Sequence, residues 1–150
     1  MLRLLNFMPM MIIVVLIYFV ASFAGSSEGA TVSEQVTNFW AAQAFAVPMV
    51  SGAVWIVDWG TILLALGLLA LYIEVSLSAR SSAAQIVNHV FSMVIFVISL
   101  VLFFIVEQAA TSVFFLLIMM MFVDVVAGFT ISIRSARRDF GGGDHIMPHG

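Results

Sequence analysis

Three titratable residues lie inside or at the end of long apolar segments, and their types would suit proton chemistry. These residues are Glu74, His89 and Asp124, and Ser92 adds a hydroxyl three residues after the histidine. A charged side chain is costly inside a bilayer, so titratable groups at such depth commonly mark proton or ion paths. Histidine titrates near neutral pH, which suits a relay. The set therefore raises the hypothesis of a proton path.

Two non-transport interpretations of the same residues stay open. In the first, Glu74 forms a hydrogen bond with His89 or with a nearby hydroxyl. Glu74 and His89 lie on consecutive antiparallel helices at about the same depth in the membrane, so their side chains could meet. Asp124 is then neutral and hydrogen-bonded within the chain. In the second, either acid faces an arginine of a partner protein. We prefer internal bonding as the sequence-based interpretation.

A second pattern places Glu74 on a face of small residues. Ala53, Gly60, Gly67 and Glu74 recur every seven residues, so on one helix they would share a face. Small residues let a neighbouring helix backbone approach closely, which is how helices associate in lipid. We therefore expect a helix-packing groove that aims Glu74 at a neighbour.

The elements that must carry these residues are membrane helices. The chain has 150 residues, of which 63 % are hydrophobic, well above an ordinary soluble domain. The apolar runs are continuous and do not alternate as barrel strands do, which favours helices. We predict an all-α membrane protein with four transmembrane helices: an N-terminal one ending near Ala24, then about Trp55–Leu77, Gln85–Val106 and Thr111–Ile133. The short connection between the last two predicts an antiparallel pair.

Two segments allow alternatives. The N-terminal run also fits a signal peptide cleaved after Ala24, although we favour a retained helix. Thr31 and Glu34 have the spacing of a capping box, which predicts a helix starting near Val32. Its apolar residues recur on one side as far as Val47, so we expect an amphipathic helix at the membrane surface between the first and second spans. A re-entrant segment over 47–57 is the alternative.

The arginines predict the orientation. With four spans, all five basic residues fall on one side of the membrane: Arg3, Arg80, Arg134, Arg137 and Arg138. The acids between spans fall on the other side: Glu28, Glu34, Asp58 and Glu107. The positive-inside rule then places both termini in the cytoplasm of a bacterial-type inner membrane. We divide the chain into a transmembrane domain, 1–139, and a flexible tail, 140–150, whose histidines lack a framework for metal binding.

Several function classes are excluded by residue content. The chain has no cysteine, so disulfides, thiolate metal sites and thiol redox chemistry are excluded. It has no lysine, its few arginines form no nucleic-acid surface, and no catalytic motif is present. His89 alone within the spans cannot provide bis-histidine haem ligation. We therefore expect no enzyme activity, cofactor or metal.

The expected function is a non-enzymatic accessory or assembly subunit of a larger inner-membrane complex. Its partners would be the lipid bilayer and other membrane subunits, or further copies of the chain. The alternative is a small oligomeric proton or cation transporter that uses Glu74, His89 and Asp124. A third possibility is a lipid- or polymer-handling partner of a membrane synthase.

Overall fold

The computed structural model describes residues 9–25, 28–78 and 83–141, with side chains over 9–25, 28–76 and 87–130. Its helices are α2 (Met10–Ala24), α3 (Val32–Ala41), α4 (Trp59–Ser78), α5 (Ala83–Ile105), the short 3-10 helix η1 (Glu107–Ala109) and α6 (Ser112–Gly141). Two strands, β1 (Gln43–Pro48) and β2 (Val54–Asp58), complete it. Arg3, Arg80 and the tail over 142–150 lie outside the described residues.

Three helices are long and apolar enough to cross a membrane, and α2 is a shorter apolar helix. The three segments are Trp59–Ser76, Val87–Ile105 and Ser112–Thr130. Each segment is continuously apolar and contains no proline. In a helix, such a segment forms all its backbone hydrogen bonds internally, as a bilayer requires. The predicted helical fold with several apolar helices, compatible with a multi-pass membrane protein, is therefore confirmed.

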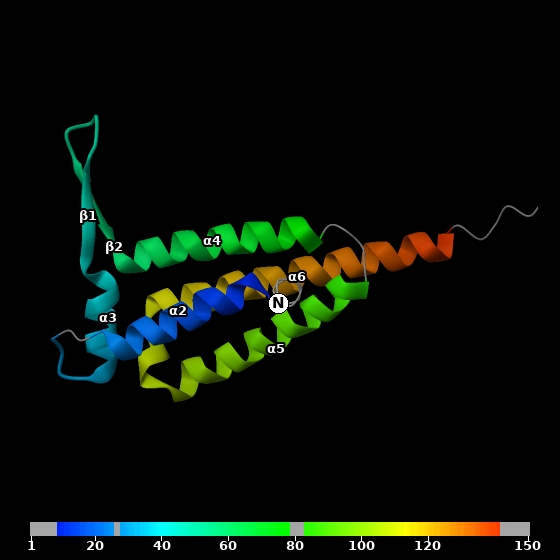
Figure 1. Ribbon diagram of the computed structural model, residues 1–150, viewed down its shortest axis with the longest axis horizontal. Helices are drawn as coiled ribbons and strands as arrows, with labels where there is room; N and C mark the ends of the chain where they lie inside the picture. The colour runs from blue at the N-terminus through cyan, green and yellow to red at the C-terminus, as the bar shows by residue number, and fades with distance from the viewer. Residues whose placement is uncertain (1–8, 26–27, 79–82, 142–150) are drawn as a thin grey trace, which may run out of the picture.

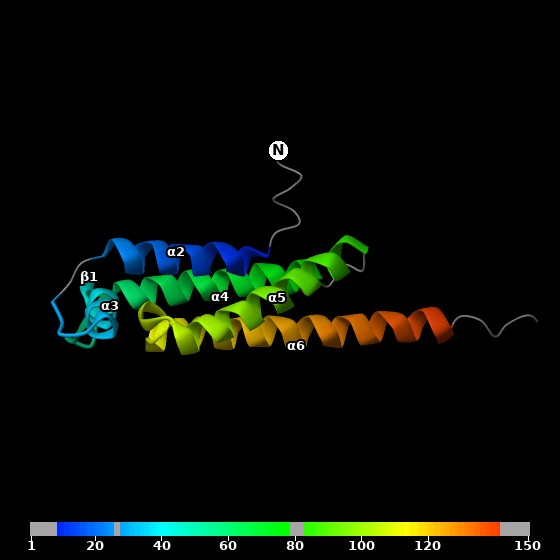
Figure 2. The same ribbon diagram turned by 90° about the horizontal axis from the view of Figure 1, so that it is seen from below.

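The four long elements run along a common direction, while the remaining ones lie across one end. In Figures 1 and 2, α5 and α6 run side by side in opposite directions, joined by η1, and α2 and α4 lie alongside them. Helix α3 crosses the end of the bundle where α4 begins. The hairpin of β1 and β2 projects sideways from that same end.

Helix α6 contributes most to the buried core. Its buried side chains meet those of α2 and α4, and the set from α6 is Phe114, Leu117, Ile118, Met121 and Val125. The small residues of α4 make this close packing possible. A Cβ atom at Gly67 would lie 3.0 Å from Leu117 Cδ2 and 3.1 Å from Met120 Sδ. Gly67 therefore serves contact within the chain, between α4 and α6.

Ala53 does not belong to the predicted helix face, and the helix predicted from about Trp55 starts four residues later. Ala53 follows the hairpin turn, in which Gly52 has a φ of +85°, a conformation that favours glycine. The β-branched and aromatic residues after it pair with β1 as a strand instead. Helix α4 begins only at Trp59, because the Asp58 side chain accepts a hydrogen bond from the Thr61 amide at 2.6 Å and caps the helix.

The amphipathic helix starts as predicted but is shorter than expected. Thr31 accepts a hydrogen bond from the Glu34 amide at 3.2 Å, and α3 begins at Val32. It ends at Ala41, since the following residues enter β1. The strands and their turn replace the helical continuation to Val47, and residues 47–57 form most of this hairpin.

Helix α6 is longer than predicted. It runs to Gly141 and not to about Ile133, because no glycine or proline interrupts residues 129–140. The expected tail from 140 therefore begins with two helical residues.

Candidate functional site

The candidate site is a buried polar cluster around Glu74 near the end of α4. The Glu74 side chain is 4 % exposed. Its Oε1 accepts hydrogen bonds from the Ser92 hydroxyl at 3.0 Å and the Asn88 side-chain amide at 3.4 Å, both on α5. Its Oε2 accepts from the backbone N–H of Met11 on α2 at 3.4 Å. One carboxyl group therefore ties three helices together.

The contact with α2 has a clear local cause. The first amides of a helix have no partner within that helix and carry partial positive charge. Helix α2 begins at Met10, so the Met11 amide belongs to this unpaired set. A carboxylate at that end satisfies the amide and is stabilised by the helix dipole. Glu74 thus acts as an external cap for α2.

Asp124 on α6 belongs to the same cluster. It is also 4 % exposed and lies close enough to Ser92, Glu74 and His89 to interact with them electrostatically. The Ser92 hydroxyl has one proton and donates it to one acceptor at a time. Its proton is given to Glu74 here, so a bond between Ser92 and Asp124 at the same time would require a proton on the Asp124 carboxyl. The arrangement can hold a proton between Glu74 and Asp124.

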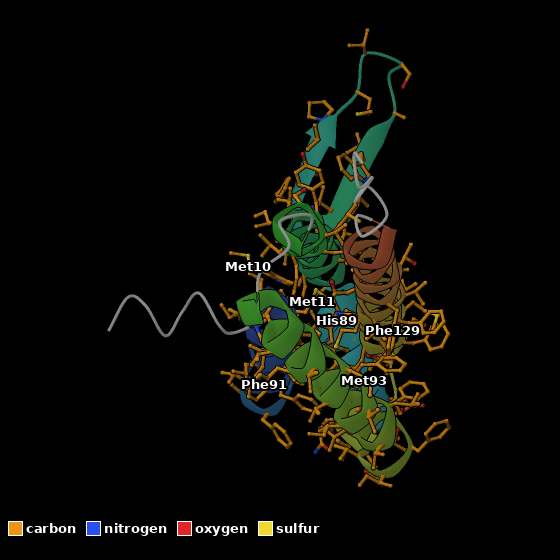
Figure 3. The ribbon with its side chains drawn as sticks, turned by 90° about the vertical axis from the view of Figure 1, so that its right-hand side faces the viewer. Met10, Met11, His89, Phe91, Met93 and Phe129 are labelled. Atoms are coloured by element: carbon orange, nitrogen blue, oxygen red, sulfur yellow. The ribbon has the colours of Figure 1, made fainter. Side chains whose placement is uncertain are left out.

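His89 lies against α6. Its ring occupies the space that a Cβ atom on Gly128 would need, and it meets the Phe129 ring edge-on with centroids 5.4 Å apart. Figure 3 shows His89 and Phe129 between α5 and α6. Among the described residues, His89 Nε2 is buried without a hydrogen-bond partner, as is Asn88 Oδ1. The hydrogen bonds to Glu74 from α5 come from Asn88 and Ser92.

The sequence predicts Glu74, His89, Ser92 and Asp124 as intramembrane polar residues, and the structure adds the Met11 amide to this site. A start of the first helix at Met10 is suggested by Pro9, since proline is common at helix starts. Because Glu74 lies near the same depth in the membrane, a helix start at Met10 suggests a contact between the Glu74 carboxyl and the Met11 amide.

A second polar network lies at the opposite end of the bundle. The Tyr18 hydroxyl, fully buried on α2, lies 2.6 Å from both the Gln108 carbonyl and the Thr111 hydroxyl. A carbonyl can only accept, so Tyr18 donates to Gln108 and Thr111 donates to Tyr18. The Tyr18 ring also stacks on Trp40 of α3, with centroids 5.2 Å apart. This network fixes α3 and the η1 turn on the bundle.

Trp40 is further held by a hydrogen bond from its indole N–H to the Ser22 hydroxyl at 3.0 Å. Within the described ranges, no group of three or more histidine and acidic side chains is arranged to hold a metal ion.

No family model, curated protein or solved structure matches the chain.

Proposed function

We propose that the protein is a non-enzymatic accessory or assembly subunit of a larger inner-membrane complex, with four spans and α3 at the outer surface. The observation that carries this proposal is the bonding of Glu74. Glu74, a buried carboxyl group near the end of α4, accepts three hydrogen bonds from α2 and α5. Such bonding supports a role in holding the bundle together, because a carrier group must exchange its partners during turnover.

The packing of α2 supports its role as the fourth span. Met11, Val14, Val15 and Tyr18 are buried against the rest of the bundle along the whole helix. Interhelical packing and hydrogen bonds are the forces that hold membrane helices together. Helix α2 packs on α4 and α6 and is hydrogen-bonded to α4 and to the turn before α6, so it behaves as a member of the bundle.

The charge distribution supports an orientation with termini inside. Glu34, Asp58 and Glu107 belong to α3, β2 and η1, which lie at one end of the bundle. The arginines at 134, 137 and 138 belong to the last turns of α6, at the opposite end. Arginines near the end of a span are retained in the cytoplasm.

The subunit proposal is tested by purification of the tagged chain from its native membrane in two mild detergents, followed by mass spectrometry. A tagged, unrelated multi-pass protein at equal expression is the control. We expect the same partner proteins at a fixed ratio in both detergents and none of them with the control. Elution as a monomer or a homo-oligomer alone would contradict the subunit role.

A second candidate function is a small proton or cation transporter. It is favoured by the position of Ser92 between two acids and by the nearby His89, whose Nε2 has no partner within the described ranges. Titratable groups that share a hydroxyl can exchange a proton with little movement. This candidate predicts a proton flux in proteoliposomes of the purified chain alone, which the subunit proposal does not.

A further inference from the structure

The hairpin of β1 and β2 is apolar on both faces. The strands pair in antiparallel register, so residues directly opposite each other share a face. One face carries Phe45 with Val57 and Val47 with Trp55; the other carries Ala46 with Ile56 and Pro48 with Val54. No charged residue occurs from Gln43 to Val57. The sequence thus provides no face suited to water.

The chain leaves most of both faces uncovered: Val57, at the base of the hairpin, is buried and Val47 is half-buried, but the other paired apolar residues are exposed. Trp55 and Ile56, on opposite faces, are 52 % and 57 % exposed, and Val50 at the tip is fully exposed. A two-stranded hairpin without a covered face is marginally stable in water. Exposed apolar surface of this kind marks an interaction site. The hairpin therefore needs an apolar environment from outside the chain.

The position of the hairpin determines what that environment is. It leaves the bundle directly before Trp59, where the apolar span of α4 begins, and its base is closed by a hydrogen bond from the Trp59 amide to the Ala42 carbonyl at 3.2 Å. Figure 1 shows that it extends sideways from the helices, and Figure 3 shows both strands side by side when the bundle is viewed along its length. The sheet therefore spreads across the helix direction, at the level where the span begins.

We propose that the hairpin lies in the bilayer, at the boundary between headgroups and acyl chains of the leaflet at this end. Tryptophan is enriched at this boundary, and both Trp55 and Trp59 lie here. The outer edges of the two strands leave backbone groups that need water or headgroup partners, which the hydrocarbon centre lacks. Since the hairpin has no basic residue, zwitterionic lipid is sufficient. The proposal depends on the membrane spans and not on the subunit role.

The absence of native cysteine allows a direct test by site-directed spin labelling. Val50→Cys and Ile56→Cys variants place one nitroxide each on exposed positions of the hairpin. Leu68→Cys, on the exposed surface of α4, is the lipid control, and Glu107→Cys, exposed at the same end of the bundle, is the aqueous control. The full chain is reconstituted in phosphatidylcholine vesicles, and collision rates with oxygen and with a water-soluble nickel chelate are measured.

We expect nickel collision rates at both hairpin labels to be several-fold lower than at Glu107→Cys, with oxygen collision rates approaching those at Leu68→Cys. Nickel rates equal to those at Glu107→Cys would overturn the proposal, because the hairpin would then lie in water. Low rates with both reagents would also overturn it, because protein, including a second copy of the chain, would then cover the hairpin. All four substitutions are at exposed positions, so the bundle core is unchanged.

Discussion

Replacement of Tyr18 by phenylalanine isolates one hydroxyl in the network that holds α2 to the η1 turn. The phenylalanine ring keeps the stack on Trp40 and the contact with Phe114. What is lost is the donor to the Gln108 carbonyl and the acceptor for the Thr111 hydroxyl, both at 2.6 Å. The change therefore measures two interhelical hydrogen bonds and little else.

Hydrogen bonds between membrane helices contribute about 0.6 kcal/mol on average and about 1.7 kcal/mol at most. Two such bonds predict a loss of about 1–3 kcal/mol in the free energy of unfolding for Tyr18→Phe. The assay is unfolding by sodium dodecyl sulfate in mixed micelles, followed by tryptophan fluorescence, to which Trp40 on the Tyr18 ring contributes. Tyr72→Phe, 71 % exposed, is the matched control and should change stability by less than about 0.5 kcal/mol. Equal stability of the two variants would refute the assigned network.

Three further predictions follow from the packing and the charges. Gly67→Leu should reduce recovery of folded protein more than Leu68→Ala, because the new side chain meets α6; equal monodispersity in size-exclusion chromatography would argue against this contact. Reporter fusions at Gly150 should report cytoplasm and at Gln108 periplasm, and a periplasmic C-terminus would contradict the four-span topology. Glu74→Leu should leave the Met11 amide and the Asn88 side-chain amide without their acceptor and lower stability by about 1–3 kcal/mol; a denaturant midpoint equal to that of wild type would contradict the network.

The long helices were predictable because continuous apolar residues and a short turn leave few alternatives. Helix α5 starts two residues before, and ends one residue before, the predicted bounds, and α6 starts one residue late. The hairpin was not predictable from periodicity, because its residues are apolar on both faces and continue directly into an apolar helix. Gly52 and the β-branched residues after Ala53 were the available signals.

The sequence was sufficient to predict the depth of the site residues in the membrane. It was not sufficient to predict which way each side chain points around its helix axis. Estimated depth brought Glu74 level with the first turns of the third span. It did not decide which side chain of α5 faces α4. Asn88 and Ser92 are four residues apart and share a face, whereas His89 is turned by about 100° from Asn88 and about 60° from Ser92 and meets Gly128. Tertiary packing of α5 on α6 settles that rotation, and the sequence alone does not contain it.

The central claim is that Glu74 holds the bundle together and does not carry protons. It is tested most directly by proton flux in proteoliposomes of the wild-type chain and of Glu74→Gln, driven by a pH gradient, with folding checked by monodispersity. The amide keeps the shape of the side chain and still accepts hydrogen bonds, but it cannot release a proton. We predict that both proteins are folded and that neither exceeds the flux of empty vesicles. A wild-type flux that disappears in a folded Glu74→Gln variant would contradict this claim and establish the transporter.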